Sequence, residues 1–382
     1  MARCSRISSL FIALIILCAF ALGPSVSHSL AQTATSPVTV GVFPFSAAYD
    51  SAKGEVFVSN FLEGTVSVIS DSGNTVVATV TVGSGPEGLA YDSAKGEVFV
   101  ANFNNNTVSV ISDKTNTVVA SVKVGSGPTD IACDSGKGEI FVSDNRAHEV
   151  SVVSDSSDAV VATVTVRSGP WGAAYDGAKG EVFVANNGNS TVSVISDATN
   201  GVTATIGVMS GPIGVAYDPV KGELFVSNSN NGTVSVISDA TYTVVSSVKV
   251  GEQPWGVAYA AGGRIFVSSG ENDSVSIISD ATNSVTSSLA VGSDPRGLAY
   301  DSGKGELFVA DAYDNAVSVL SVSGASTSTT STSSATATTG QASPGLPYYA
   351  EVAGVTVAVV GAIALGLFAY RRSRHKRRRR AR

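Results

Sequence analysis

The chain has 382 residues, a formal net charge of −7 at pH 7, and 43% hydrophobic against 14% charged residues. Three cysteines are too few for a disulfide framework, and three histidines leave little material for a catalytic or metal centre built on imidazole. The acidic balance disfavours polyanionic partners such as nucleic acid.

Residues 1–31 have the pattern of a secretory signal peptide. Arg3 and Arg6 precede a 13-residue apolar run at 10–22, and Ser29 and Ala31 occupy the small-residue positions of a cleavage site. The alternative is an uncleaved anchor, but this run falls short of the roughly 20 residues that span a bilayer. We therefore expect cleavage after Ala31.

Residues 32–322 are organised by one repeated pattern. Its landmark, Tyr91-Asp92, recurs at spacings of 42 residues five times and 41 once. The other copies are Tyr49-Asp50, Cys133-Asp134, Tyr175-Asp176, Tyr217-Asp218, Tyr259-Ala260 and Tyr300-Asp301. Seven copies at this period, each with four short strand patterns, predict an all-β, seven-bladed β-propeller with four-stranded antiparallel blades.

The second copy shows the expected strands at 88–92, 97–102, 107–112 and 117–124, each rich in Val, Ile, Phe or Thr. Gly96 stands where a tight hairpin needs a positive φ, and Asp113 and Asn116 can bond the turn backbone. We interpret the recurrent acidic residues of these turns as turn formers and expect no metal site.

Two positions are identical in all seven copies, and both indicate core. A small residue in the first strand suits a crowded central axis, and a large apolar residue in the second strand suits packing between neighbouring sheets. The alanines are Ala48, Ala90, Ala132, Ala174, Ala216, Ala258 and Ala299, and the phenylalanines are Phe57, Phe99, Phe141, Phe183, Phe225, Phe266 and Phe308. Cys133, in a tyrosine slot, is expected to be buried.

The ends of the repeat region indicate how the ring closes. The seventh copy ends with a third strand at 315–322 and has no fourth strand after it. Residues 37–42 align instead with the fourth strand that precedes the second copy. The N-terminal strand is therefore expected to complete the last blade, which leaves no long sheet edge unpaired.

Variation concentrates on the face that carries the loops into the first strands and between the second and third strands. The residue after the loop proline is Phe45, Glu87, Thr129, Trp171, Ile213, Trp255 and Arg296 in successive copies. Aromatic and charged side chains around a propeller mouth suit sugar stacking or a protein partner, so these seven are the candidate ligand-binding residues. The alternative is that Trp171 and Trp255 only fill space between blades.

The neighbouring loops carry four sequons for N-glycosylation, at Asn105, Asn189, Asn231 and Asn272, although asparagine also favours turns. His148 lies in one of these loops beside Arg146 and Glu149. One histidine without further ligands makes a poor metal site, so we interpret it as a solvated loop residue and assign no catalytic residue.

The C-terminal part predicts display on a membrane. Residues 323–347 form a Ser/Thr-rich stalk, residues 348–370 an apolar span of membrane length, and residues 371–382 a tail with nine Lys or Arg. The positive-inside rule puts the tail in the cytoplasm, where it can attract anionic lipid headgroups, and the propeller outside. Without the signal and tail, 13 basic residues face 31 acidic ones, a net charge of about −18.

Segments at 56–60, 98–102, 182–186 and 224–228 read VFVSN, VFVAN, VFVAN and LFVSN, each followed by TVSVIS. They resemble the YVTN-type β-propeller repeat of cell-surface and surface-layer-like proteins of archaea and bacteria, with Phe for the motif's Tyr and Ser or Ala for its Thr. The resemblance covers residues 36–322 and implies a surface location with binding or structural roles. It implies no shared catalytic residues.

We therefore expect a type I single-pass surface protein whose propeller binds an extracellular protein or glycan, without a cofactor. The nearest alternative is a structural component of the envelope, which self-association into arrays would favour. The fold is also similar to lactonase-type and antibiotic-lyase propellers. An enzyme of that kind would need His148 to converge with Glu or Asp carboxylates across the funnel.

Overall fold

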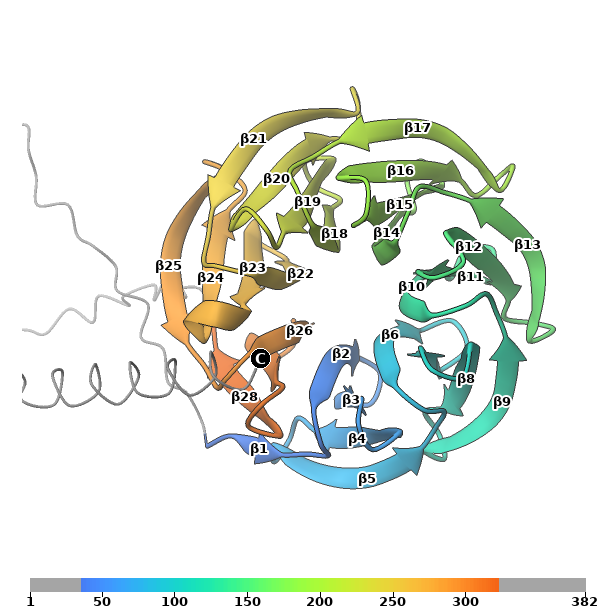
Figure 1. Cartoon of the computed structure of the whole chain (residues 1–382). Helices are drawn as coiled ribbons and strands as arrows, with labels where there is room; N and C mark the ends of the chain where they lie inside the picture. Colours follow the sequence, from blue (N-terminus) through green and yellow to red (C-terminus); the bar gives the residue numbers. More distant parts are fainter. Residues whose placement is uncertain (1–35, 323–382) are drawn as a thin grey trace, which may run out of the picture. The chain divides into compact units, whose positions relative to one another are not determined.

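The computed structural model describes residues 36–322. The predicted signal peptide, stalk, membrane span and basic tail lie outside these residues and stay predictions. Within the described range, 28 strands form seven four-stranded antiparallel sheets, which confirms the all-β propeller. Figure 1 shows these sheets as blades around a central axis, with the first strand of each blade innermost.

We number the blades 1 to 7 in the chain order of their innermost strands. The strands fall into four tiers, and the strands of each tier are given from blade 1 to blade 7. The innermost are β2 (Pro44–Asp50), β6 (Pro86–Asp92), β10 (Pro128–Asp134), β14 (Pro170–Asp176), β18 (Pro212–Asp218), β22 (Pro254–Ala260) and β26 (Pro295–Asp301). The second are β3 (Glu55–Asn60), β7 (Glu97–Asn102), β11 (Glu139–Asp144), β15 (Glu181–Asn186), β19 (Glu223–Asn228), β23 (Arg264–Ser269) and β27 (Glu306–Asp311). The third are β4 (Thr65–Ser70), β8 (Thr107–Ser112), β12 (Glu149–Ser154), β16 (Thr191–Ser196), β20 (Thr233–Ser238), β24 (Ser274–Ser279) and β28 (Ala316–Ser321). The outermost are β5 (Thr75–Thr81), β9 (Thr117–Lys123), β13 (Ala159–Thr165), β17 (Gly201–Gly207), β21 (Thr243–Lys249), β25 (Ser284–Ala290) and β1 (Val38–Thr39).

The N-terminal strand closes the ring, as the alignment predicts. Strand β1 pairs antiparallel with β28, Val38 opposite Val317 and Thr39 opposite Ala316. It has two residues instead of the expected 37–42. Pro37 has no N–H for the ladder, and beyond β1 the backbone N–H of Val40 donates to the carbonyl of Asn315 (3.0 Å) as the chain turns into the loop before β2.

The core lies between blades. The seven repeated phenylalanines are completely buried, and the seven alanines are buried or half-buried in the innermost strands. Each apolar cluster draws on two adjacent blades; one cluster joins Phe57 and Val68 of blade 1 to Leu89 and Val98 of blade 2. Cys133 is half-buried and packs against the cluster between blades 2 and 3. Each blade therefore needs its neighbours to bury its faces.

The turns follow the sequence with two corrections. Gly96 has φ 69°, as expected. In the turn between the first and second strands, Asp92 bonds the backbone, because its Oδ1 accepts from the Ala94 N–H (2.9 Å). In the turn between the third and fourth strands, Asn116 bonds the turn through its backbone N–H to the carbonyl of Ser112 (2.9 Å) and not through its side chain. The expected turn former Asp113 accepts a hydrogen bond from the Tyr91 hydroxyl (3.3 Å). The inner-strand tyrosine reaches this carboxylate, which explains why the Tyr-Asp landmark recurs.

Polar contacts also link neighbouring blades on the side opposite the variable loops. Burial raises the pKa of Tyr49 in blade 1, and the hydrogen bonds and charges of Asp301 in blade 7 and Asp71 in blade 1 add to this rise. Lys304 of blade 7 forms an ion pair with Asp71 (3.0 Å), so this carboxylate accepts a hydrogen bond from Tyr49 within blade 1 and pairs with Lys304 across the closing junction.

Within the described range, no helix is long and apolar enough to cross a membrane. The helical structure assigned there is one 3₁₀ turn, η1 (Gly270–Asn272), in the loop between β23 and β24.

Candidate functional site

The variable residue of each copy is the second residue of an innermost strand. Pairing with the second strand is irregular at this point: Pro170 pairs with Asn186, and the register resumes only at Ala173 opposite Val184. The residues between Pro170 and Ala173 are therefore outside the regular ladder, as expected at a β-bulge, and their side chains can be directed toward the axis or between blades.

The residue after the variable one is glycine in five copies, because the innermost strands approach closely. A Cβ on Gly172 would overlap the carbonyl oxygen of Ile213 in the next blade. The five are Gly88, Gly172, Gly214, Gly256 and Gly297. Ser46 and Asp130 occupy this position in the first and third copies, and both are placed at the axis by the same geometry.

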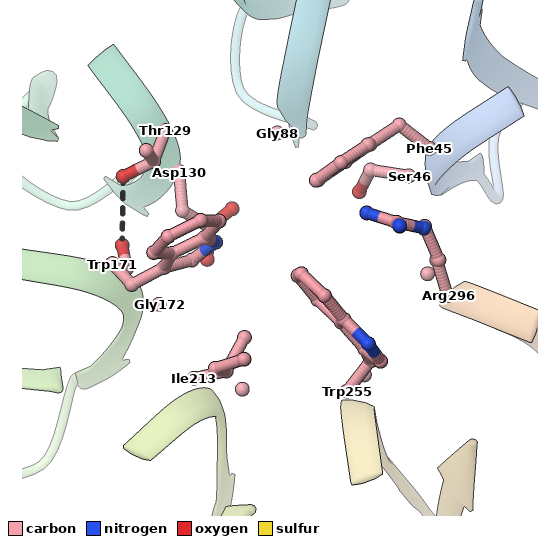
Figure 2. A pocket seen from close by; sticks show the side chains of 13 residues that line it. Phe45, Ser46, Gly88, Thr129, Asp130, Trp171, Gly172, Ile213, Trp255 and Arg296 are labelled. Carbon is pink, nitrogen blue, oxygen red and sulfur yellow. Dashed lines mark hydrogen bonds between the residues drawn. The ribbon is translucent and has the colours of Figure 1, made fainter. Parts of the chain in front are cut away.

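Six of the seven predicted candidates come together in one cavity of about 70 Å³ at the axis (Figure 2). They are Phe45, Thr129, Trp171, Ile213, Trp255 and Arg296, joined by Ser46, Asp130 and the glycines. The seventh, Glu87, does not line the cavity and is only 4% exposed. Thr129 and Ile213 are also largely buried, so the more accessible side chains are those of Phe45, Trp171, Trp255 and Arg296.

The aromatic rings form a connected row across the cavity. Trp171 of blade 4 meets Trp255 of blade 6 edge to face, with ring centroids 5.8 Å apart, and Trp255 meets Phe45 of blade 1 in the same way at 5.9 Å. The row continues through Phe61 to Phe43. The two tryptophans thus contact each other across the axis, rather than each filling a gap between adjacent blades.

Arg296 lies among these rings and is held by a carboxylate. Its guanidinium is 4.3 Å from the ring centroid of Trp255 and 4.9 Å from that of Phe45. Its Nε and one terminal nitrogen donate to Asp294 Oδ2 at 3.2 and 3.1 Å. Both partners are largely buried, so this arginine is fixed in place and fixes one side of the aromatic row.

Two further carboxyl groups belong to blades 2 and 3: Asp130 lines the cavity, and Glu87 is buried outside the lining. Burial raises the pKa of Asp130 to about 7, although the backbone N–H of Ala173 donates to its Oδ2 (3.0 Å). Burial also raises the pKa of Glu87 to about 8; Arg296 opposes this rise and Asp130 adds to it. Glu87 Oε2 is buried without a hydrogen-bond partner among the described residues. These raised values mark a desolvated acidic pair, as at many functional sites.

Sequence reasoning missed Asp130 and Ser46 as members of the site. The available signal was their position: both stand where five other copies have glycine. Because the glycine at this position faces the axis, a residue with a side chain there places that side chain at the axis.

The sequon asparagines have a structural role. In each, Oδ1 accepts from a backbone N–H of the loop that enters the same blade; for Asn189 the donor is Ser168 (2.6 Å), and for Asn231 it is Ser210 (2.7 Å). The other two pairs are Asn105 with Ser84 and Asn272 with Glu252. All four residues are exposed, and glycan occupancy stays a prediction.

His148 belongs to the same loop system and not to the lining of the cavity. It has φ 60°, and its Nδ1 accepts a hydrogen bond from the Gly169 N–H (3.1 Å), which links blade 3 to the loop entering blade 4. Residues 36–322 contain no group of three or more His, Cys, Asp or Glu side chains that could hold a metal ion.

Comparisons with known proteins agree with the fold. The NHL repeat matches residues 84–111, which cover β6, β7 and most of β8. The comparison with curated proteins gives no match. Among solved structures, the chain is similar to Kuenenia stuttgartiensis Hydrazine Synthase, with 17% identity, 75% of this chain and 97% of that chain covered, and a TM-score of 0.67. At this identity the likeness concerns the fold alone. The chain is thus a β-propeller built from repeats, one of which is similar to the NHL repeat, and the finer YVTN assignment stays a prediction.

Proposed function

We propose that the propeller is a binding module of the YVTN type that recognises an extracellular protein or glycan through the cavity at the axis. The proposal includes secretion by residues 1–31, anchoring by residues 348–370 and no catalysis. Its main support is the convergence of Trp171 and Trp255 on one cavity with Phe45 and Arg296. Aromatic and arginine side chains at the centre of a concave surface are typical of binding hot spots.

The repeated architecture strengthens this argument. The copies are nearly identical in their strands, yet the position that faces the axis differs in all but two of them. Ring stability alone would be served by the same small or apolar residue in each blade. The variation is therefore best explained by a ligand that lacks sevenfold symmetry.

A binding screen of the full-length protein against arrays of surface proteins and glycans tests the proposal. We expect replacement of Trp171 and Trp255 together by alanine to weaken binding of the selected ligand by about 30-fold or more. The matched control is Phe103→Ala, which removes an aromatic ring from the same face, where it stacks with Arg146 outside the cavity lining. Wild-type affinity in a folded double variant would place the binding site elsewhere.

A second candidate, a structural component of the envelope, is favoured by one observation. The outermost strands expose pairs of valines, and Val77, Val119, Val161 and Val245 are each more than half exposed. An apolar belt of this kind suits contacts between copies of the chain. Light scattering of the full-length protein against concentration tests it. Self-association that decreases in Val161→Thr, the residue blade 4 has at Thr203, would support it, and a monomer at all concentrations would exclude it.

A further inference from the structure

The cavity has an imbalance of charge. Arg296 is compensated by Asp294 through two hydrogen bonds to one carboxylate oxygen. Neither Asp130 nor Glu87 forms an ion pair within 4 Å among the described residues. Arg146 lowers the pKa of Glu87 through its charge, but its guanidinium stacks on Phe103, with 4.2 Å between guanidinium carbon and ring centroid. Asp130 in the cavity lining and Glu87 outside it are therefore two acids without an ion-pair partner, and a cation bound at Asp130 would compensate their charge.

The aromatic side of the cavity also favours a cation. Arg296 already lies over Trp255, whereas Trp171 contacts one other ring, that of Trp255, and is partly exposed. Asp130 lines the same cavity, and its Oδ2 accepts from the N–H of Ala173, two residues after Trp171. A positive group between these two side chains would interact with a carboxylate and with an aromatic face.

The size of the cavity limits what can enter. At roughly 30 Å³ for a water-sized group, about 70 Å³ accepts two or three non-hydrogen atoms. This is enough for the end of an unbranched side chain. A pyranose ring is larger than this volume and would contact the aromatic rings from the open side of the cavity.

We propose that the cavity receives the ammonium end of a lysine side chain from a partner protein, with Asp130 as its hydrogen-bond acceptor and Trp171 packed against it. This inference rests on the proposed function, because it assumes that the mouth is the binding site, and it names the partner's chemistry. Glu87, buried outside the lining, adds a second negative charge when it is ionised, and Trp255 with Arg296 positions Trp171.

Intrinsic fluorescence offers a site-specific measurement, since both tryptophans of the chain lie in the cavity. The probes are Nα-acetyl-lysine methylamide and the corresponding 2-aminoheptanoic acid derivative, in which a methyl group replaces the ammonium group and the side chain keeps its length. The full-length protein should respond saturably to the first and not to the second. Asp130→Asn and Asp130→Gly, the latter restoring the residue of five other copies, should weaken binding about tenfold or more.

The matched control is Asp144→Asn, which removes a buried carboxylate of the same blade outside the cavity lining and should leave the affinity unchanged. Equal responses to both probes would overturn the proposal, and so would unchanged affinity in folded Asp130 variants or a stronger response to glucosamine than to the lysine probe. If no ammonium probe binds but an array ligand still depends on Trp171 and Trp255, the lysine assignment is wrong and the binding function stands. An array ligand that ignores both tryptophans refutes the function itself.

Discussion

Asp144 and Asp311 occupy a buried position that asparagine fills in four other blades. Asn60 there donates to the hydroxyls of Thr65 and Ser67, both at 3.0 Å. Asp144 instead accepts from the Ser151 hydroxyl (2.6 Å), and burial raises its pKa to about 7 despite this bond. The blade thus tolerates a carboxyl group best when it is protonated and resembles the amide.

We predict that Asp144→Asn stabilises the protein at pH 8 and has little effect at pH 4. The folded-state pKa of Asp144 lies above the ordinary value of 3.8, so its stabilising protonated form is lost as pH rises through about 7. The variant does not lose stability in this way, and its free energy of unfolding at pH 8 should exceed that of the wild type by about 1–4 kcal/mol. Urea unfolding at the two pH values measures it. An equal effect at both would contradict the ionisation argument.

Binding of the lysine probe should depend on pH through Glu87 and Asp130. Their pKa values of about 8 and 7 mean that both are partly protonated at neutral pH, while Arg296 and Arg146 keep their charges and Asp294 is bound to Arg296. A bound ammonium group favours ionised carboxylates, so binding releases protons and tightens as pH rises. We expect up to about tenfold per pH unit between pH 6 and 8 for each proton released. Fluorescence titrations check this, and an affinity that is flat over this range would exclude ionisation of the pair.

At the scale of strands, the fold was predictable and the orientation of the site residues was not. The expected strands at 97–102 and 107–112 match β7 and β8, because alternating apolar residues end at turn-forming glycine, asparagine and aspartate. The same register in each copy also brings the variable position to the axis. Whether a side chain lines the cavity, as Trp171 does, or is buried, as Glu87 is, depends on contacts between neighbouring blades. A pattern within one blade does not contain that information.

The close approach of the innermost strands makes a second stability prediction. In β14 a side chain on Gly172 would overlap the backbone of Ile213 in β18, and backbone cannot move aside as a flexible side chain could. Gly172→Ala should therefore lower the free energy of unfolding by more than about 3 kcal/mol or prevent folding. Gly207→Ala in the outermost strand β17 is the control, because its Cβ would meet no atom within 4 Å. Similar unfolding midpoints for the two variants would show that the innermost strands can separate without cost.

For the propeller as a whole, one apolar and one polar contact hold the closing junction between blades 7 and 1, and we expect them to contribute differently to the free energy of unfolding. Val38 of β1 is only 7% exposed and packs in a cluster with Phe308 and Val317 of blade 7. Lys304 reaches Asp71 at 3.0 Å, but its side chain is 40% exposed. Solvent screens the ion pair and not the apolar contact, so the ring should be held mainly by the packing of β1.

We predict that Val38→Ala costs about 1–3 kcal/mol, whereas Lys304→Met costs less than about 1 kcal/mol. Val80→Ala is the matched control, since Val80 takes the same place in β5 and is 5% exposed. If the ring unfolds as one unit, Val38→Ala and Val80→Ala should shift the urea midpoint equally, even though β1 has two residues and β5 has seven. A loss confined to Val80→Ala would mean that the ring stays closed without β1. A larger loss in Val38→Ala would make the closing junction the place where unfolding starts, because a propeller that opens there exposes two sheet faces at once.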